Sequence, residues 1–290
     1  KRLKEKNIPV FIISGNHDPY TKDSLWFSYT FPSNVIIFDS SSLEPKSVGN
    51  LDIYGLAYTN NTKEPLKGFK AEKSDKFKIG LVHGSTTNIK EDDDPEYSYR
   101  PITKEQIDSS GLDYIALGHF HDLLEVKAKV KCFYCGSPEG LSFKNKPDSG
   151  VLIATFSNGN VSVKPYKTAI REFHNVEIDC TKLDNDSEIR KTLQKNKGDN
   201  KILRLVLKGS PSLEFQLDKE ILEKEFSSDY FYLKIDDRIH IPENLQEDET
   251  IRGQFIRLLK EEIKKEEDEE KKKKLENALR IGVSYLDKKL

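Results

Sequence analysis

Four of the six histidines directly follow short apolar segments that have the composition of buried strands. His17 follows residues 10–13, His83 follows residues 77–82, and His119 and His121 follow residues 113–117. Because the carboxyl ends of neighbouring strands in an α/β sheet meet at one crevice, we expect these side chains to converge. Imidazole, amide and carboxylate groups are ligands for first-row transition metals. The spacing therefore predicts a metal site at one edge of a sheet.

The elements that must position these residues alternate along the first part of the chain. Apolar runs predict strands at residues 10–13, 35–38, 51–58, 77–82, 113–117, 127–134, 150–156 and 161–163. Residues 1–6 have the composition of the end of a helix, and Thr103 is a good N-cap for a helix over 103–109. Strands interleaved with helices predict a layered α/β or α+β domain that ends near residue 166.

A second β-α-β-α-β pattern follows over residues 170–240, which predicts a small separate domain. Its expected strands are 172–178, 201–207 and 230–236, and its expected helices are 187–195 and 218–226. Residues 247–290 repeat apolar residues at helical spacing around a charged stretch. The apolar positions are Ile251, Phe255, Leu258, Leu259, Ile263, Leu275, Leu279, Val283 and Leu286. We expect one or two helices with an apolar stripe that docks on a partner, the alternative being that the stripe folds back on its own chain.

Composition limits the classes of protein that remain. There are 47 Lys+Arg and 49 Asp+Glu, so the net charge of 47 − 49 = −2 gives no global sign of a nucleic-acid-binding face. No apolar run reaches the roughly 18 residues of a membrane span, so we expect no membrane association. Cys132, Cys135 and Cys180 are too few for a disulfide framework. We expect Cys132 and Cys135 to lie on opposite faces of a strand as packed thiols, rather than in a redox or metal site.

Three parts of the sequence resemble, in order and spacing, the last three motifs of the calcineurin-like metallophosphoesterases. They are Gly15-Asn16-His17-Asp18, His83 and Gly118-His119-Phe120-His121. The resemblance covers roughly residues 8–165. It implies an α/β (α+β) fold built as a two-sheet sandwich flanked by helices. It also implies two divalent metal ions at one end of the sandwich, with Mn²⁺ as the expected metal.

A narrower resemblance is to the SbcD-type exonucleases of DNA double-strand-break repair. It is carried by Gly136-Ser137-Pro138-Glu139, Ser142-Phe143, Gly150-Val-Leu-Ile153 and Thr250-Ile-Arg-Gly253. This resemblance implies a nuclease domain over 1–168, a small α/β capping domain over 169–245 and a helical tail over 246–290. Residues 247–290 would then grip the coiled-coil base of an SMC-like ATPase, and DNA would be the substrate. A homodimer is an open alternative, and the expected location is cytoplasmic.

The family's residue roles can be carried over to the matching positions. By the resemblance, Asn16, His83 and His119 hold one metal ion and His121 holds the other. His17 stays free of metal beside the scissile phosphate and protonates or stabilises the leaving oxygen. Asp18 accepts a hydrogen bond from His17 and orients it. Two metal ions about 3.5–4 Å apart can activate a water molecule and neutralise the developing phosphoryl charge.

Two earlier motifs of the family, Asp-x-His and Gly-Asp-x-x-Asp, do not occur in this sequence. They carry further metal ligands, including the carboxylate that bridges the two ions. The sequence also begins at Lys1 and contains no Met. We therefore expect the nuclease domain to be N-terminally truncated, without its first βαβ portion, and to be catalytically crippled. The predicted function is that of the parent protein.

Three functions compete on these grounds. The first is a metal-dependent DNA exonuclease or endonuclease subunit that works with an SMC-like ATPase in double-strand-break repair. The second is a phosphatase or cyclic-nucleotide phosphodiesterase of the same superfamily. The third is a non-catalytic, partner-binding subunit that has lost its carboxylates. The capping-like domain and the amphipathic tail favour the first over the second.

Overall fold

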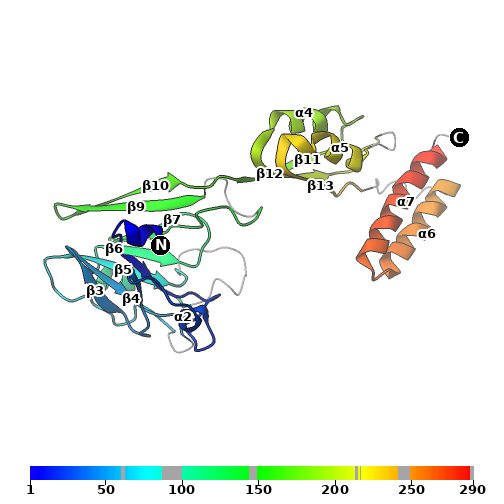
Figure 1. Ribbon diagram of the computed structural model, residues 1–290. Helices are drawn as coiled ribbons and strands as arrows, with labels where there is room; N and C mark the ends of the chain where they lie inside the picture. Colours follow the sequence, from blue (N-terminus) through cyan, green and yellow to red (C-terminus); the bar gives the residue numbers. More distant parts are fainter. Residues whose placement is uncertain are drawn as a thin grey trace. The chain divides into compact units, whose positions relative to one another are not determined.

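The computed structural model describes residues 1–59, 63–86, 100–143, 149–212, 215, 217–240 and 249–287. The chain forms two compact units, Lys1–Ala169 and Ile170–Leu290. Among the described residues, each unit has hydrophobic clusters of its own. Several sheets are interleaved with helices, so the mixed α/β fold expected from the sequence is confirmed (Figure 1).

A six-stranded mixed sheet is the centre of the N-terminal unit. Its order is β3 (Glu44–Val48), β4 (Leu51–Gly55), β5 (Phe77–His83), β6 (Tyr114–Gly118), β8 (Lys131–Tyr134) and β7 (Leu124–Val126). The inner strands β4, β5, β6 and β8 are parallel, and the edge strands β3 and β7 are antiparallel to their neighbours. The parallel strands therefore end together at one edge of the sheet, which is where the histidines lie.

Two smaller strand pairs pack against one face of this sheet. β1 (Val10–Ile12) pairs in parallel with β2 (Val35–Ile37), and β9 (Gly150–Ser157) pairs with β10 (Asn160–Lys167) as an antiparallel hairpin. Alternate side chains of β9 and β10, together with Phe11 and Phe38, form one apolar cluster with Ile79 and Tyr114 of the main sheet. The result is two layers of strands (Figure 1).

Three short helices complete the N-terminal unit: α1 (Arg2–Glu5), α2 (Leu25–Ser28) and α3 (Lys104–Ser109). Thr103 and Gln106 form a capping box at the start of α3, as expected for a Thr N-cap. Asn7 takes the left-handed conformation (φ 52°) just after α1, so the backbone turns into β1.

Three local expectations for this unit are wrong. Residues 127–134 are not one strand, because β7 and β8 form a hairpin and only Lys131–Tyr134 belongs to β8. The strand expected over 51–58 ends at Gly55. α2 and β3 were not expected at all, because α2 has four residues and β3, Glu-Pro-Lys-Ser-Val, is a polar edge strand without apolar alternation.

The C-terminal unit begins with a three-stranded parallel sheet in the order β11 (Glu172–Asp179), β12 (Gly198–Lys208) and β13 (Tyr230–Asp237). Helix α4 (Ser187–Lys195) connects β11 to β12. Helix α5 (Lys219–Phe226) and the short η2 (Ser227–Asp229) connect β12 to β13. Leu203, Leu205 and Leu207 alternate along β12 and pack with side chains of both helices, so α4 and α5 cover the same face of the sheet.

The chain ends in two helices, α6 (Ile251–Lys265) and α7 (Glu269–Asp287), which pack on each other. Their shared core is Ile256, Leu279 and Val283, supported by Phe255, Leu259 and Ile263. The expectation that the apolar stripe stays unburied is therefore largely wrong, because the two helices bury most of it between them. Ile251 and Leu258 remain 75% and 66% exposed.

None of the helices that the structure describes combines the length and the apolar character required to cross a membrane.

Candidate metal centre

His83, the last residue of β5, is the side chain around which the other predicted ligands lie. Its Nε2 atom lies 2.8 Å from Oδ1 of Asn16, which comes four residues after β1. Its ring centroid lies 5.5 Å from that of His119, which follows β6. The structure thus brings Asn16, His83 and His119 together at the carboxyl edge of the sheet.

The glycines that open two of the motifs make this proximity possible. A Cβ atom on Gly15 would lie 2.8 Å from Cε1 of His83, and a Cβ atom on Gly118 would lie 2.9 Å from Nδ1 of the same ring. Real Cβ contacts are essentially never shorter than 3.0 Å. The His83 ring is therefore wedged between two backbone segments that only glycine lets approach so closely.

His119 has an unusual backbone. Its φ is 126°, a conformation that L residues other than glycine rarely adopt. The next residue, Phe120, packs edge-on against the buried Tyr134, with ring centroids 4.8 Å apart. Such strain persists only where the surroundings enforce it, and it is concentrated at functional sites. Here it turns the His119 ring towards His83.

The surroundings keep His83 neutral. Burial above all, together with the positive potential of His119, Arg100, His17 and His121, lowers the pKa of His83 to about 4. The same interactions show that His17 and His121 lie within electrostatic reach of His83. A neutral imidazole is the form that can donate its lone pair to a metal ion.

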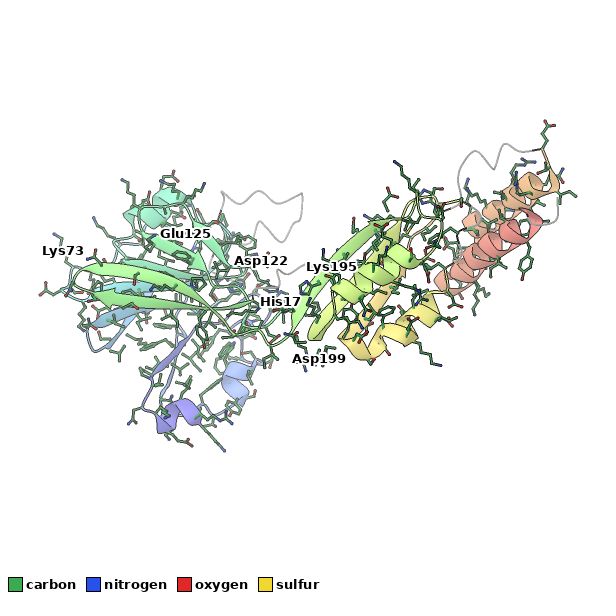
Figure 2. The ribbon with its side chains drawn as sticks, turned by 90° about the horizontal axis from the view of Figure 1, so that it is seen from above. His17, Lys73, Asp122, Glu125, Lys195 and Asp199 are labelled. Atoms are coloured by element: carbon green, nitrogen blue, oxygen red, sulfur yellow. The ribbon has the colours of Figure 1, made fainter. Side chains whose placement is uncertain are left out.

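His17, Asp18 and His121 are on the exposed side of the site. Figure 2 labels His17 and also Asp122, the neighbour of His121, at the same end of the N-terminal unit. Asp18 has a different partner from the expected one. Its Oδ1 accepts a hydrogen bond from the backbone amide of Gly15 (2.8 Å), and its carbonyl accepts one from Nε1 of Trp26 (2.6 Å). In this structure Asp18 closes the Asn-His-Asp turn, and the hydrogen bonds found for the described residues do not join it to the His17 ring.

The spacing of the Asn16 and His83 donor atoms fits a shared metal ion. Two ligands about 2.1 Å from an ion and at right angles to each other lie about 3 Å apart, which matches the 2.8 Å between Asn16 Oδ1 and His83 Nε2. His121 is the one residue expected at a second ion. Among the residues that the structure describes, no three His, Cys, Asp or Glu side chains form a ready-made metal site. The measured donor spacing thus supports a shared ion for the Asn16–His83 pair.

Three side chains around His83 escaped the sequence analysis. The Tyr58 ring packs edge-on against the His83 ring, with centroids 5.6 Å apart. The Arg100 guanidinium lies over the Tyr58 ring. The Tyr134 hydroxyl donates to the Gly84 carbonyl (2.7 Å) and accepts from the Thr86 amide (3.0 Å), which fixes the loop after His83. Tyr58 and Tyr134 lie at or just beyond strand carboxyl ends, so the rule that located the histidines could have located them too.

Other candidates lie elsewhere. Lys73, from the lysine-rich loop before β5, lies at the opposite end of the N-terminal unit from His17 (Figure 2). That loop precedes the amino end of β5, whereas the histidines follow the carboxyl ends. His174 and His240 belong to the C-terminal unit. The loop over residues 91–94 lies outside the described residues.

Comparison with known proteins identifies the first part of the chain. Residues 1–123 match the family described as calcineurin-like phosphoesterase. The N-terminal unit contains a calcineurin-like metallophosphoesterase domain. The expected family is therefore confirmed for this domain.

Relatives extend the similarity beyond the phosphoesterase domain. The chain is 29% identical over 224 residues to the metallophosphoesterase YhaO of Bacillus subtilis (strain 168), which covers 72% of the chain and 53% of the relative. It is 27% identical over 244 residues to the DNA double-strand break repair protein Mre11 of Sulfurisphaera tokodaii, covering 77% of the chain and 60% of the relative. The Mre11 protein of Saccharolobus solfataricus is 23% identical over 267 residues, or 84% of the chain and 67% of the relative. The chain thus spans between about half and two thirds of the length of these relatives.

Proposed function

We propose that the phosphoesterase domain is part of a metal-dependent DNA nuclease, an exonuclease or endonuclease subunit of double-strand-break repair. The observation that carries the proposal is the group formed by Asn16, His83 and His119, with His17 on its exposed side. Relatives named as DNA double-strand break repair proteins support a nucleic-acid substrate. The similarity to the Sulfurisphaera tokodaii protein covers 77% of the chain, which is more than the N-terminal unit Lys1–Ala169, and therefore includes part of the C-terminal unit.

Within this proposal each side chain has a role. Asn16, His83 and His119 hold one divalent ion, expected to be Mn²⁺, and His121 contributes to a second. Bound ions supply Lewis-acid activation and charge neutralisation at the phosphate. His17 protonates the leaving oxygen, because its side chain is exposed beside the ligand group. Asp18 shapes the turn that presents His17, through its bond to the Gly15 amide.

The proposal includes a partner. Residues 247–290 would bind the coiled-coil base of an SMC-like ATPase. The α6–α7 hairpin has a core of its own, so the partner would contact the residues that stay exposed on it, among them Ile251, Leu258, Ile281 and Tyr285. A mixed surface of exposed apolar and charged side chains suits helix-on-helix recognition.

The substitution His17→Ala tests the catalytic assignment. In a form of the protein that also carries the two acidic motifs, we expect Mn²⁺-dependent cleavage of labelled duplex DNA. His17→Ala should lower kcat by about 10²–10⁴-fold, because a general acid is lost, and should leave Mn²⁺ affinity unchanged in calorimetry. Parallel loss of bound Mn²⁺ and of activity would show that His17 is a ligand instead. Lys73→Ala, at the other end of the unit, is the matched control.

The same assay separates the competing functions. Cleavage of bis(p-nitrophenyl) phosphate without cleavage of DNA would favour a phosphatase or phosphodiesterase. A non-catalytic, partner-binding subunit is the remaining alternative. That candidate predicts binding of the ATPase coiled coil with no hydrolysis of either substrate, even when the acidic motifs are present.

A further inference from the structure

We infer that Tyr58 and Arg100 form a stacked pair that positions the His83 ring for metal binding. This inference rests on the proposed function only in taking His83 as a ligand. Neither residue is expected to touch the substrate or the ion. Both act through contacts that hold His83 against Asn16.

Tyr58 makes the direct contact. Its ring meets the His83 ring at 86°, with centroids 5.6 Å apart, so one side of the imidazole rests against an aromatic edge. The backbone of Tyr58 is tied to the segment that leads into the Asn-His-Asp turn. Its amide donates to Oγ of the buried Ser14 at 2.7 Å. Tyr58 therefore contacts both His83 and the strand end that delivers Asn16.

Arg100 covers a face of the Tyr58 ring. Its guanidinium carbon lies 3.1 Å from the centroid of the Tyr58 ring, and its NH2 group donates to the Thr59 carbonyl. The residue is only 8% exposed. A buried planar cation over an aromatic face is a favourable and geometrically specific contact. Arg100 thus restricts the Tyr58 ring from its face, while His83 contacts the same ring in a T-shaped arrangement.

The backbone of Arg100 is also fixed beside the histidine. It has a positive φ of 51°, which is uncommon outside glycine. A Cβ atom on Gly84, the residue after His83, would lie 2.5 Å from the Arg100 carbonyl oxygen. The Ile102 amide donates to the Ser85 carbonyl at 2.8 Å, which joins the two segments again. The loop after β5 and the Arg100 segment therefore move as one.

The orientation of an imidazole ligand is normally fixed by groups outside the ligand set, and losing such a group typically weakens metal binding about 10–100-fold. Hydrogen-bonded carboxylates or carbonyls usually serve this purpose. In the described part of this chain, the aromatic edge of Tyr58 and the two glycine backbones occupy that position around His83.

The test observes the ring itself and does not depend on hydrolysis. In metal-free, ¹⁵N-labelled chain at pH 7, the His83 nitrogens should show one tautomer with the proton on Nε2. The 2.8 Å contact to the acceptor Asn16 Oδ1 is shorter than the 3.5 Å from the Asn16 amide, which decides the tautomer. Tyr58→Leu and Arg100→Ala should give averaged nitrogen shifts and should weaken Mn²⁺ binding about 10–100-fold. Tyr58→Phe, which keeps the ring, should behave like the wild type.

Several controls keep the inference falsifiable. Arg171 stacks on Phe231 in the C-terminal unit in the same way (3.8 Å), so Arg171→Ala should leave the His83 signals unchanged. Arg100→Lys keeps the charge without the planar stack and replaces Arg100→Ala if that variant does not fold. In the Tyr58→Leu background, Arg100→Ala should have no further effect.

Wild-type His83 shifts in both Tyr58→Leu and Arg100→Ala would overturn the inference. Absence of Mn²⁺ binding by the wild type would count against the proposed function instead, while the tautomer result would still decide the role of the pair.

Discussion

His83 shows how the candidate site depends on single residues. Its ring lies between Gly15 and Gly118, at distances that leave no room for a Cβ atom on either. We expect Gly118→Ala to displace the ring and to weaken Mn²⁺ binding about 10–100-fold, as for the loss of a supporting contact. Calorimetric titration with Mn²⁺ measures the change in affinity. Gly198→Ala is the matched control, because its Cβ would meet only the flexible Lys201 side chain. Unchanged affinity in Gly118→Ala would show that His83 is not held as described.

Asp52 illustrates a residue-scale effect on stability. It is 8% exposed, and its carboxylate accepts from the hydroxyls of Ser47 (2.6 Å) and Ser74 (3.0 Å) and from Nζ of Lys76 (3.1 Å). These hydrogen bonds, that of Ser47 above all, lower the pKa of Asp52. We expect Asp52→Asn to cost about 1–3 kcal/mol at neutral pH, since a buried acceptor set loses its charge. The free energy of unfolding measured in urea gives the value.

The pH dependence of Asp52 has a definite sign. A carboxyl group with a lowered folded-state pKa contributes stability above its unfolded pKa of about 3.9, and this contribution is lost as the pH falls further. The difference between wild type and Asp52→Asn should therefore be constant from pH 5 to 7 and shrink below about pH 4. Asp75→Asn, at an exposed position nearby, should show no such difference. A gap that persists at low pH would mean that packing, and not charge, is lost.

At the scale of elements, local sequence patterns predicted where most strands and helices lie along the chain. The apolar runs before His17, His83 and His119 identified β1, β5 and β6, and the rule that parallel strands end together anticipated the grouping of their last residues. Tyr58 was passed over because an aromatic residue after an apolar strand is usually a core residue. The Arg100–Tyr58 contact joins residues 42 positions apart. Nothing in the local sequence of either residue signals such a contact.

Two cysteines near the end of β8 differ in exposure. Cys132 is fully buried, whereas Cys135, just after the strand, is exposed. Burial raises the pKa of the Cys132 thiol to about 12, so it is not a thiolate at neutral pH. We expect a thiol reagent to modify Cys135 alone in the native protein and all three cysteines in denaturant, as counted by mass spectrometry. Protection of Cys135 on adding Zn²⁺ would instead indicate a metal site.

The α6–α7 hairpin offers a comparison within one helix. Ile256 is fully buried against Leu279 and Val283, whereas Leu258, two residues later, is 66% exposed. We expect Ile256→Ala to cost about 2–5 kcal/mol, the usual range for emptying a packed site. Leu258→Ala should change stability by less than about 0.5 kcal/mol. Hydrogen exchange of the backbone amides in α6 and α7 measures the change in stability in each variant. Equal protection in the two variants would mean that the helices do not pack as the structure shows.

At the scale of the whole molecule, the apolar clusters follow the division of the chain. In the part of the chain that the structure describes, two clusters lie within Lys1–Ala169 and two within Ile170–Leu290. Cooperative folding follows the packed core, so a segment with a complete core can fold by itself. This separation also explains why the order of elements was readable from the sequence in both halves. Each half buries its own periodic residues.

The last prediction concerns the independence of the C-terminal unit. Residues 170–290, produced alone, should fold and unfold cooperatively. The midpoint temperature should equal that of the corresponding transition in the whole chain. The reason is that the cores of β11–β13 and of α6–α7 lie entirely within this segment. Circular dichroism of both proteins during heating makes the comparison. Leu205→Ala, at a fully buried position of β12, should cost about 2–5 kcal/mol equally in both proteins. If the isolated segment has no cooperative transition, its core requires residues of the phosphoesterase domain. The division into two units would then not be a division into two folding units.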